Sequence, residues 1–340
     1  MLDEIRKEAA RLSKRKRQGG AKSILSTDYA LLSEMLSDAA ARKNAEKTRD
    51  KSAEDALGAA LAVHGITAEE ISVVGARERN VSLRNLRAED GKSVECEWVE
   101  ESCIRALGKS VCGLRFSYEG GMLSAFAVSR RVFRVTGGVY TAAGKEGECA
   151  ADAALTIENE SGYAYALLCD GMGSGERAAQ AASLGVRFLS ALLSADVGRQ
   201  VALALLNNAI CASEEECSVA LDLLSLDLYE GRAGFLKSGA AASFVFRDGA
   251  LFRIRSRTIP LGLLRIVDSE EASFDVREGD ILVLLSDGVL GENEDGGRLK
   301  EILAAGGDSA FCARRIVEDS IARGVSRDDK TAVVLTVFSA

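Results

Sequence analysis

Residues 163–175 read YAYALLCDGMGSG, a mostly apolar run that ends in an aspartate and three alternating glycines. The same format returns in residues 280–288, DILVLLSDG, where the apolar run again stops at Asp-Gly. In residues 327–338, RDDKTAVVLTVF, an acidic pair comes directly before the apolar run. Short apolar runs bounded by turn residues predict strands that are buried in a sheet. We therefore expect all three acidic positions to lie at strand ends.

The three acidic motifs carry more information together than singly. Asp-Gly is ordinary turn chemistry, so each motif alone predicts only a turn. A buried strand that ends in a tight turn holds its carboxylate rigidly, and several such carboxylates brought together repel one another unless cations neutralise them. Hard oxygen ligands favour Mg²⁺ or Mn²⁺. The shared format therefore indicates a site for divalent cations.

The rest of the second half alternates between strand-like and helix-like patterns. Besides the runs at 163–169, 281–286 and 331–338, strands are expected at 234–236, 243–246 and 251–255, and amphipathic helices over 176–193, 200–211 and 308–323. Strand-rich sheets with helices packed outside them are typical of a layered α+β sandwich rather than of a parallel βαβ fold.

The first half predicts a helical start and a small α+β domain. Residues 29–40 form an amphipathic pattern after N-cap residues at 26–28, and a second helix is expected around 57–63. Strands at 71–74 and 81–86, a helix at 96–107, and a hairpin of 111–118 with 122–128 follow. We therefore divide the chain into a basic start with a regulatory helix (1–52), a small α+β regulatory domain (53–138) and a larger domain (139–340).

Bulk properties narrow the class of protein. The 340 residues are 47% hydrophobic and 28% charged, which predicts globular domains. The net charge of −8 argues against general nucleic-acid binding, and neither a signal peptide nor a membrane span is indicated, so a cytoplasmic location is expected. The eight cysteines include no C-x-x-C pair and are interpreted as reduced core residues.

The second half resembles the PP2C-like family of metal-dependent protein phosphatases, in its bacterial sporulation branch, over roughly residues 139–340. The three acidic motifs carry the resemblance together with GECAAD at 147–152, in which Asp152 lies 18 positions before Asp170. The segments LDLY at 226–229, GAAASF at 239–244 and IPLG at 259–262 have the order and separation of family landmarks.

The resemblance implies a serine/threonine phosphoprotein phosphatase with a PP2C-like fold and two bound Mn²⁺ or Mg²⁺ ions. Asp170 would bridge the ions, Asp287 and Asp328 would complete one metal site, and Asp152 and the carbonyl of Gly171 would contribute to the other. Asp170 and Asp287 are thereby expected to be catalytic. The ion pair would activate water for direct attack on the phosphoryl group, so no phosphoenzyme is required.

The chain also departs from the family pattern. Eukaryotic relatives carry a histidine two residues after the bridging aspartate, where this chain has Met172, and its single histidine is His64 in the first half. A family proline is replaced by Ala242. Asp329, next to a metal ligand, is expected to support the site rather than bind an ion. A dinucleotide site is disfavoured because Glu176 stands where the third glycine of G-x-G-x-x-G would fall.

The resemblance also implies a protein substrate, a phosphorylated anti-anti-sigma factor whose dephosphorylation would activate a sporulation sigma factor. The helix at 29–40 would dock on the phosphatase domain and bias its active state, and its apolar stripe makes a homodimer plausible. Membrane attachment would come only through a region absent from this chain. Two alternatives remain: a catalytically silent PP2C-like interaction module, and a phosphatase of another bacterial partner-switching pathway.

Overall fold

A computed structural model describes residues 31–340 except 32, 36, 39–40, 43, 90, 146–148, 174, 214–216 and 292–295. The described chain forms two compact units, a smaller one built mainly from Leu36–Val132 and a larger one built mainly from Phe133–Ser339. The larger unit begins a few residues before the boundary expected between 138 and 139, because the strand expected to start near Val139 starts at Phe133.

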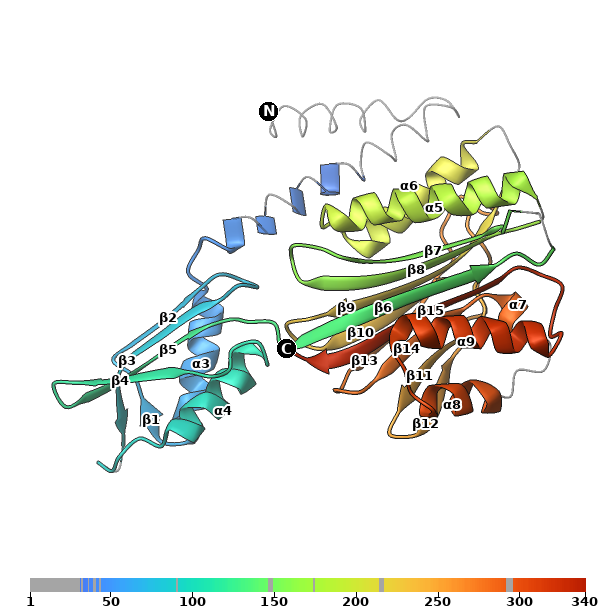
Figure 1. Cartoon of the computed structure of the whole chain (residues 1–340). Coiled ribbons are helices and arrows are strands. Elements are labelled where there is room, and N and C mark those ends of the chain that lie inside the picture. Colours follow the sequence, from blue (N-terminus) through green and yellow to red (C-terminus); the bar gives the residue numbers. More distant parts are fainter. Residues whose placement is uncertain are drawn as a thin grey trace, which may run out of the picture. The chain divides into compact units, whose positions relative to one another are not determined.

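The smaller unit is one antiparallel sheet with two helices on it (Figure 1). Its strands run in the order β1-β3-β5-β4, and β2 also pairs with β3. Helices α3 and α4 pack with the sheet around a single hydrophobic cluster. The elements are α3 (Lys51–Val63), β1 (Ile66–Thr67), β2 (Glu70–Val74), β3 (Asn80–Ala88), α4 (Cys96–Leu107), β4 (Arg115–Glu119) and β5 (Met122–Val128).

Local chemistry explains where this unit differs from the sequence prediction. Helix α3 begins at Lys51 rather than near residue 57, because the Asp50 carboxylate accepts a hydrogen bond from the Ala53 N–H and caps the helix. The strand expected from residue 111 begins only at Arg115, since Gly113 has a φ of 66°, which a strand does not allow. Trp98 of α4 is 40% exposed and stacks on His64 at the end of α3.

The larger unit contains two five-stranded antiparallel sheets. The first has the order β13-β10-β9-β8-β7 and the second has the order β12-β11-β14-β15-β6. Their strands are β6 (Phe133–Ala142), β7 (Asp152–Glu158), β8 (Tyr163–Gly171), β9 (Val219–Asp227), β10 (Arg232–Ser238), β11 (Ser243–Arg247), β12 (Ala250–Ile254), β13 (Glu270–Asp275), β14 (Ile281–Leu285) and β15 (Lys330–Ser339).

Helices cover the outer faces of both sheets, which gives the layered α+β sandwich predicted from the sequence (Figure 1). Helices α5 and α6 pack on the first sheet, and α8 and α9 pack on the second. A third hydrophobic cluster fills the space between the sheets. The helices are α5 (Glu176–Ser194), α6 (Arg199–Cys211), α7 (Asp287–Leu290), α8 (Gly297–Ala304) and α9 (Ser309–Ala322).

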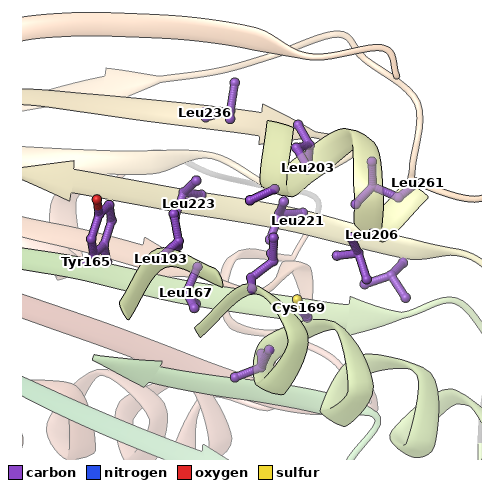
Figure 2. Close-up of a cluster of buried hydrophobic side chains, with 14 of the residues drawn as sticks. Tyr165, Leu167, Cys169, Leu193, Leu203, Leu206, Leu221, Leu223, Leu236 and Leu261 are labelled. Atoms are coloured by element: carbon purple, nitrogen blue, oxygen red, sulfur yellow. The ribbon is translucent and has the colours of Figure 1, made fainter. Parts of the chain in front are cut away.

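Strand β8 shows how the alternation of side chains builds two of these layers at once. Tyr165, Leu167 and Cys169 point toward α5 and α6, as Figure 2 shows, and belong to the cluster beneath those helices. Ala166 and Leu168, one residue out of phase, belong to the cluster between the sheets. Asp170 continues this second series, so its carboxylate is on the face that looks toward the other sheet.

The cysteines are all free, but only part of the prediction about them is confirmed. Cys103, Cys169 and Cys312 are buried, whereas Cys96 and Cys149 are exposed.

Half of the residues in the amphipathic segment at 29–40 lie outside the described residues. Met35 is described, and it packs against the hydrophobic cluster beneath α5 and α6. No helix in the part of the chain that the structure describes is long and apolar enough to cross a bilayer.

Candidate metal centre

The first two predicted ligands lie directly opposite each other in the first sheet. Asp152 begins β7 and Asp170 lies near the end of β8, and the register of the two antiparallel strands pairs them. Opposite residues in such a pair have Cβ atoms about 4.5–5.5 Å apart on one face. Asp152 is only 8% exposed, and its Oδ2 is buried without a hydrogen-bond partner among the described residues. Two carboxylates are thus held at one sheet end.

Gly171 follows Asp170 in a crowded position. Its N–H donates to the carbonyl of Ala151 at 3.1 Å, and a Cβ on Gly171 would overlap the carbonyl of Ala178 in helix α5. Only glycine lets the strand end run this close to the helix. The sheet end and the start of α5 are therefore locked together beside the two aspartates.

Asp287 comes from the second sheet, where it opens the short helix α7 directly after β14. The preceding Ser286 is buried, and its Oγ accepts a hydrogen bond from the Thr331 N–H at 2.9 Å. The next residue, Gly288, lies so close to Asp329 that a Cβ would overlap the Asp329 carbonyl oxygen. This contact holds the Asp287 turn against the start of β15.

Asp328 and Asp329 lie in the turn before β15 and have different surroundings. The Asp328 side chain is exposed, and its Oδ1 accepts from the N–H of Asp329 at 2.9 Å. The two oxygens of Asp329 accept from the N–H groups of Gly144 and Ala151, each at 2.6 Å. Asp329 thus ties the segment that leads into Asp152 to the turn that carries Asp328.

Lys330, the first residue of β15, stabilises the same turn. It is 4% exposed, and its Nζ donates to the carbonyl oxygens of Ser326 and Asp328 at 2.7 and 2.8 Å. The ammonium group therefore fixes backbone rather than pairing with one of the carboxylates.

The electrostatics of the cluster follow from burial and from like charges. Burial raises the pKa of Asp170 to about 8, with further contributions from Asp152, Asp287 and Asp328. Burial also raises the pKa of Asp152 to about 6, although hydrogen bonds from Ser286 and Thr331 oppose the shift. Partial burial and the charge of Asp328 raise the pKa of Asp287. Each of these carboxylates is destabilised in its charged form.

A divalent cation fits this arrangement in two respects. All the donors are hard oxygen atoms, and a cation would supply the missing partner of Asp152 Oδ2 and relieve the repulsion. Within the described residues, however, no three acidic, histidine or cysteine side chains already converge closely enough to enclose an ion.

Sequence reasoning missed two residues of this site, Ser286 and Thr331, which come from the facing sheet and act to lower the pKa of Asp152. Both adjoin the acidic motifs, so their position next to Asp287 and Lys330 was the available signal. Residue 147, the start of the predicted GECAAD landmark, lies outside the described residues. Met172 is 52% exposed, and its N–H donates to the carbonyl of Ser218.

Comparison with known proteins places the chain in one family. The family model for stage II sporulation protein E matches residues 160–338. The chain is 22% identical over 291 residues to stage II sporulation protein E of Bacillus subtilis, covering 84% of this chain and 35% of that protein. It is 28% identical over 160 residues to the Priestia megaterium protein of that name, covering 47% and 27%. The chain spans about a third of the length of these curated relatives.

Solved structures show the same fold. One contains the PP2C phosphatase domain and a fragment of the regulatory domain of SpoIIE from Bacillus subtilis; it covers 93% of this chain and 96% of its own, with a TM-score of 0.61 and 20% identity. The catalytic domain of the serine/threonine protein phosphatase PstP, in complex with two manganese ions, covers 61% and 99%, with a TM-score of 0.51 and 22% identity. The larger unit therefore has the PP2C phosphatase fold.

Proposed function

Because the chain belongs to the stage II sporulation protein E family, we propose that it is a metal-dependent serine/threonine phosphoprotein phosphatase. The observation that carries this proposal is the set of carboxylates at the ends of two facing sheets, in which Asp152 and Asp170 have raised pKa values and a buried oxygen of Asp152 lacks a partner. Burying such a set is costly unless a cation neutralises it.

Each ligand has a defined place in the proposal. Asp170, Asp287 and Asp328 would hold one ion, and Asp170 and Asp152 with the carbonyl of Gly171 would hold the other. The different exposures of these residues suit the assignment, since Asp152 is buried while Asp287 and Asp328 face solvent, from which a phosphorylated side chain must approach.

When bound, two Mn²⁺ or Mg²⁺ ions supply an activated water and stabilise charge on the phosphoryl group. The chain's own residues hold the ligands in place. Ser286 and Thr331 act to lower the pKa of Asp152, and Asp329 fixes the segment before Asp152 by accepting from two backbone N–H groups. With Met172 two residues after Asp170, the leaving group takes its proton from water or from another side chain.

The proposed substrate is a phosphorylated anti-anti-sigma factor, whose dephosphorylation would activate a sporulation sigma factor. It rests on the relatives' name, stage II sporulation protein E, and is therefore less direct than the reaction itself. Release of phosphate from a purified phosphorylated anti-anti-sigma factor, compared with an unrelated phosphoserine protein, tests it. Equal rates on both substrates would favour a different partner-switching pathway.

The remaining residues, 1–138, are proposed to control the phosphatase. Two observations support this: one solved relative joins its phosphatase domain to a fragment of a regulatory domain, and Met35 packs against the cluster beneath α5 and α6. Helix α5 begins a few residues after Asp170, so a change in its packing can reach the carboxylates. A Met35→Asp variant with the turnover of the parent would contradict this role.

Mn²⁺-dependent phosphate release tests the reaction. The parent chain, Asp170→Asn and Asp287→Asn are assayed on a phosphoserine protein and on a small aryl phosphate, with and without EDTA. The proposal predicts turnover that requires metal and is lost in both variants. Activity that survives both substitutions would contradict the assignment, and an inactive parent with excess metal would favour a silent interaction module.

Asp248→Asn provides the matched control. Its side chain is 83% exposed and lies in the turn between β11 and β12, so it removes the same charge without touching the cluster. Its turnover should equal that of the parent.

A further inference from the structure

A second group of polar side chains is buried in the larger unit, apart from the carboxylate cluster. Lys237 and Asp222 are each 1% exposed, and the Lys237 Nζ lies 2.5 Å from the Asp222 Oδ2. The same ammonium donates to the Ser243 Oγ at 2.6 Å, and the Ser243 hydroxyl donates to the Asp222 Oδ2. Ser243 is fully buried. We call these three residues the lysine network.

The lysine network lies on the same face of the first sheet as the carboxylates. Asp222 is opposite Leu168 in the register of β8 and β9, while Asp170 is opposite Ala220. Because side chains alternate along a strand, Asp222 and Asp170 point toward the same side. They are diagonal neighbours, whose separation in a sheet is roughly 7–8 Å.

The network joins the two sheets. Lys237 and Asp222 are register partners within the first sheet, on β10 and β9. Ser243 is the first residue of β11, which pairs in the second sheet with β14, the strand that leads to Asp287. The Ser243 hydroxyl therefore connects the sheet that holds Asp170 to the sheet that delivers Asp287.

Stability alone does not account for this network. Burying an ion pair costs several kcal/mol per ion in desolvation, and replacement by apolar residues is often neutral or stabilising. The Oδ1 of Asp222 is also buried without a hydrogen-bond partner among the described residues, which adds to that cost. Hydrophobic side chains fill the rest of the layer between the sheets, so apolar residues could also have filled this position.

We propose that the lysine network is a positioning device that fixes the spacing of the two sheets beneath the carboxylates and so sets the affinity of the site for divalent cations. This inference rests on the proposed two-metal site. Asp152 and Asp170 come from one sheet and Asp287 and Asp328 from the other, so the distance between the two halves of the site is a distance between the sheets. The lysine network lies two residues along the strands from the carboxylates. It restricts the distance between the sheets more narrowly than apolar contacts would, because hydrogen bonds require a fixed geometry.

The test removes the tie while leaving the ion pair in place. Mn²⁺ binding to the intact chain is measured by isothermal titration calorimetry for the parent and for Ser243→Ala, with thermal unfolding in EDTA as a check on folding. Ser243 touches no proposed ligand, so its effect should lie at the lower end of the 10–100-fold loss that follows when a residue supporting a metal ligand is replaced. We expect the Mn²⁺ dissociation constant of Ser243→Ala to rise by about tenfold.

Ser309→Ala is the matched control. Ser309 is also buried, and its hydroxyl donates to the Thr136 carbonyl and contacts the Thr336 hydroxyl, so it joins α9 to the second sheet only. Both variants lose a buried serine with several partners, and both should unfold at a lower temperature. Only Ser243→Ala should bind Mn²⁺ more weakly, whereas equal weakening in both variants would overturn the proposal.

The remaining outcomes are equally decisive. A parent that binds Mn²⁺ and a Ser243→Ala variant that binds it equally well would overturn this inference and leave the proposed function standing. A parent that binds no Mn²⁺ would overturn both. Should Ser243→Ala fail to fold, the triple variant Asp222→Leu, Lys237→Met and Ser243→Ala provides an apolar replacement, and parental Mn²⁺ affinity in it would overturn the proposal.

Discussion

The two ends of strand β14 carry the same residue type in opposite electrostatic situations. Asp280, just before the strand, is 1% exposed and accepts hydrogen bonds from the Arg247 guanidinium at 2.8 and 2.6 Å. The Arg277 N–H donates to it as well. Asp287, just after the strand, faces Asp328, and partial burial together with that charge raises its pKa. One carboxylate is neutralised by the protein and the other is not.

This contrast distinguishes a carboxylate that stabilises the fold, Asp280, from one that is proposed to bind a cation, Asp287. The Arg247 guanidinium neutralises Asp280, which supports the fold. At Asp152 and Asp170, by contrast, burial and neighbouring carboxylates disfavour the charged form and raise the pKa values. The buried Lys330 beside the cluster binds backbone carbonyls and leaves the carboxylates uncompensated. We therefore expect substitutions at the two ends to affect different properties.

The largest difference should appear in catalysis. Asp287→Asn removes a proposed metal ligand, and turnover should fall by at least about 100-fold, since even outer-shell changes at metal sites cost 10–100-fold. Asp280→Asn, at the other end of the same strand, should keep the metal dependence and most of the turnover per folded molecule. Phosphate release under saturating Mn²⁺ measures the turnover of both variants. Equal losses of turnover would contradict the assignment of Asp287 as a metal ligand and Asp280 as a structural residue.

For stability in the absence of metal, the larger loss should come from disturbing Asp280 and the smaller one from disturbing the carboxylate cluster. Arg247→Met leaves Asp280 as a buried, unpaired charge and should lower the free energy of unfolding by about 3 kcal/mol. Asp170→Asn removes a repelled charge and should not lower it. Urea unfolding in EDTA compares the two variants with the parent. A comparable loss in Asp170→Asn would mean that this carboxylate also supports the fold.

A third difference concerns pH. Folding raises the pKa of Asp152 to about 6 and the pKa of Asp170 to about 8. At pH values between the ordinary pKa of an aspartate and these raised values, the folded state therefore binds more protons than the unfolded chain. Their contribution therefore favours folding at low pH and is lost as the pH rises toward 8. The metal-free unfolding temperature of Asp170→Asn should fall less than that of the parent between pH 5 and pH 8.

The smallest effect is expected at the rim of the carboxylate cluster. Met172 follows Asp170 by two residues but is half exposed and offers no proton. Met172→Ala should change turnover by about twofold at most, the equivalent of about 0.5 kcal/mol for a surface substitution. Steady-state kinetics at several pH values checks this, and a large loss would show that the residue takes part in the reaction.

The sequence predicted most of the large elements for identifiable reasons. Apolar runs that stop at Asp-Gly, or begin after Asp-Asp, correctly placed β8, β14 and β15, and the three- and four-residue spacing placed α5, α6 and α9. Strand β9 was missed because both of its faces are buried. Its apolar residues therefore do not alternate with polar ones, and the pattern does not distinguish a strand from a helix.

Relations between strands remained hidden in the sequence. The pairing of Asp152 with Asp170 depends on hairpin register, and the support from Ser286 and Thr331 comes from the facing sheet. The contact between Lys237 and Ser243 likewise depends on how the two sheets stack. Single residues in a strand pattern give no signal for contacts of this kind, which become visible only in three dimensions.

The most direct test of the account is the stoichiometry of Mn²⁺ binding to the intact chain, measured by calorimetry for the parent, Asp170→Asn and Asp248→Asn. The account predicts two ions per parent chain, two for Asp248→Asn, and loss of both in Asp170→Asn, because Asp170 is proposed to bridge them. Absence of saturable binding in the parent, or two ions retained by Asp170→Asn, would contradict the two-metal site.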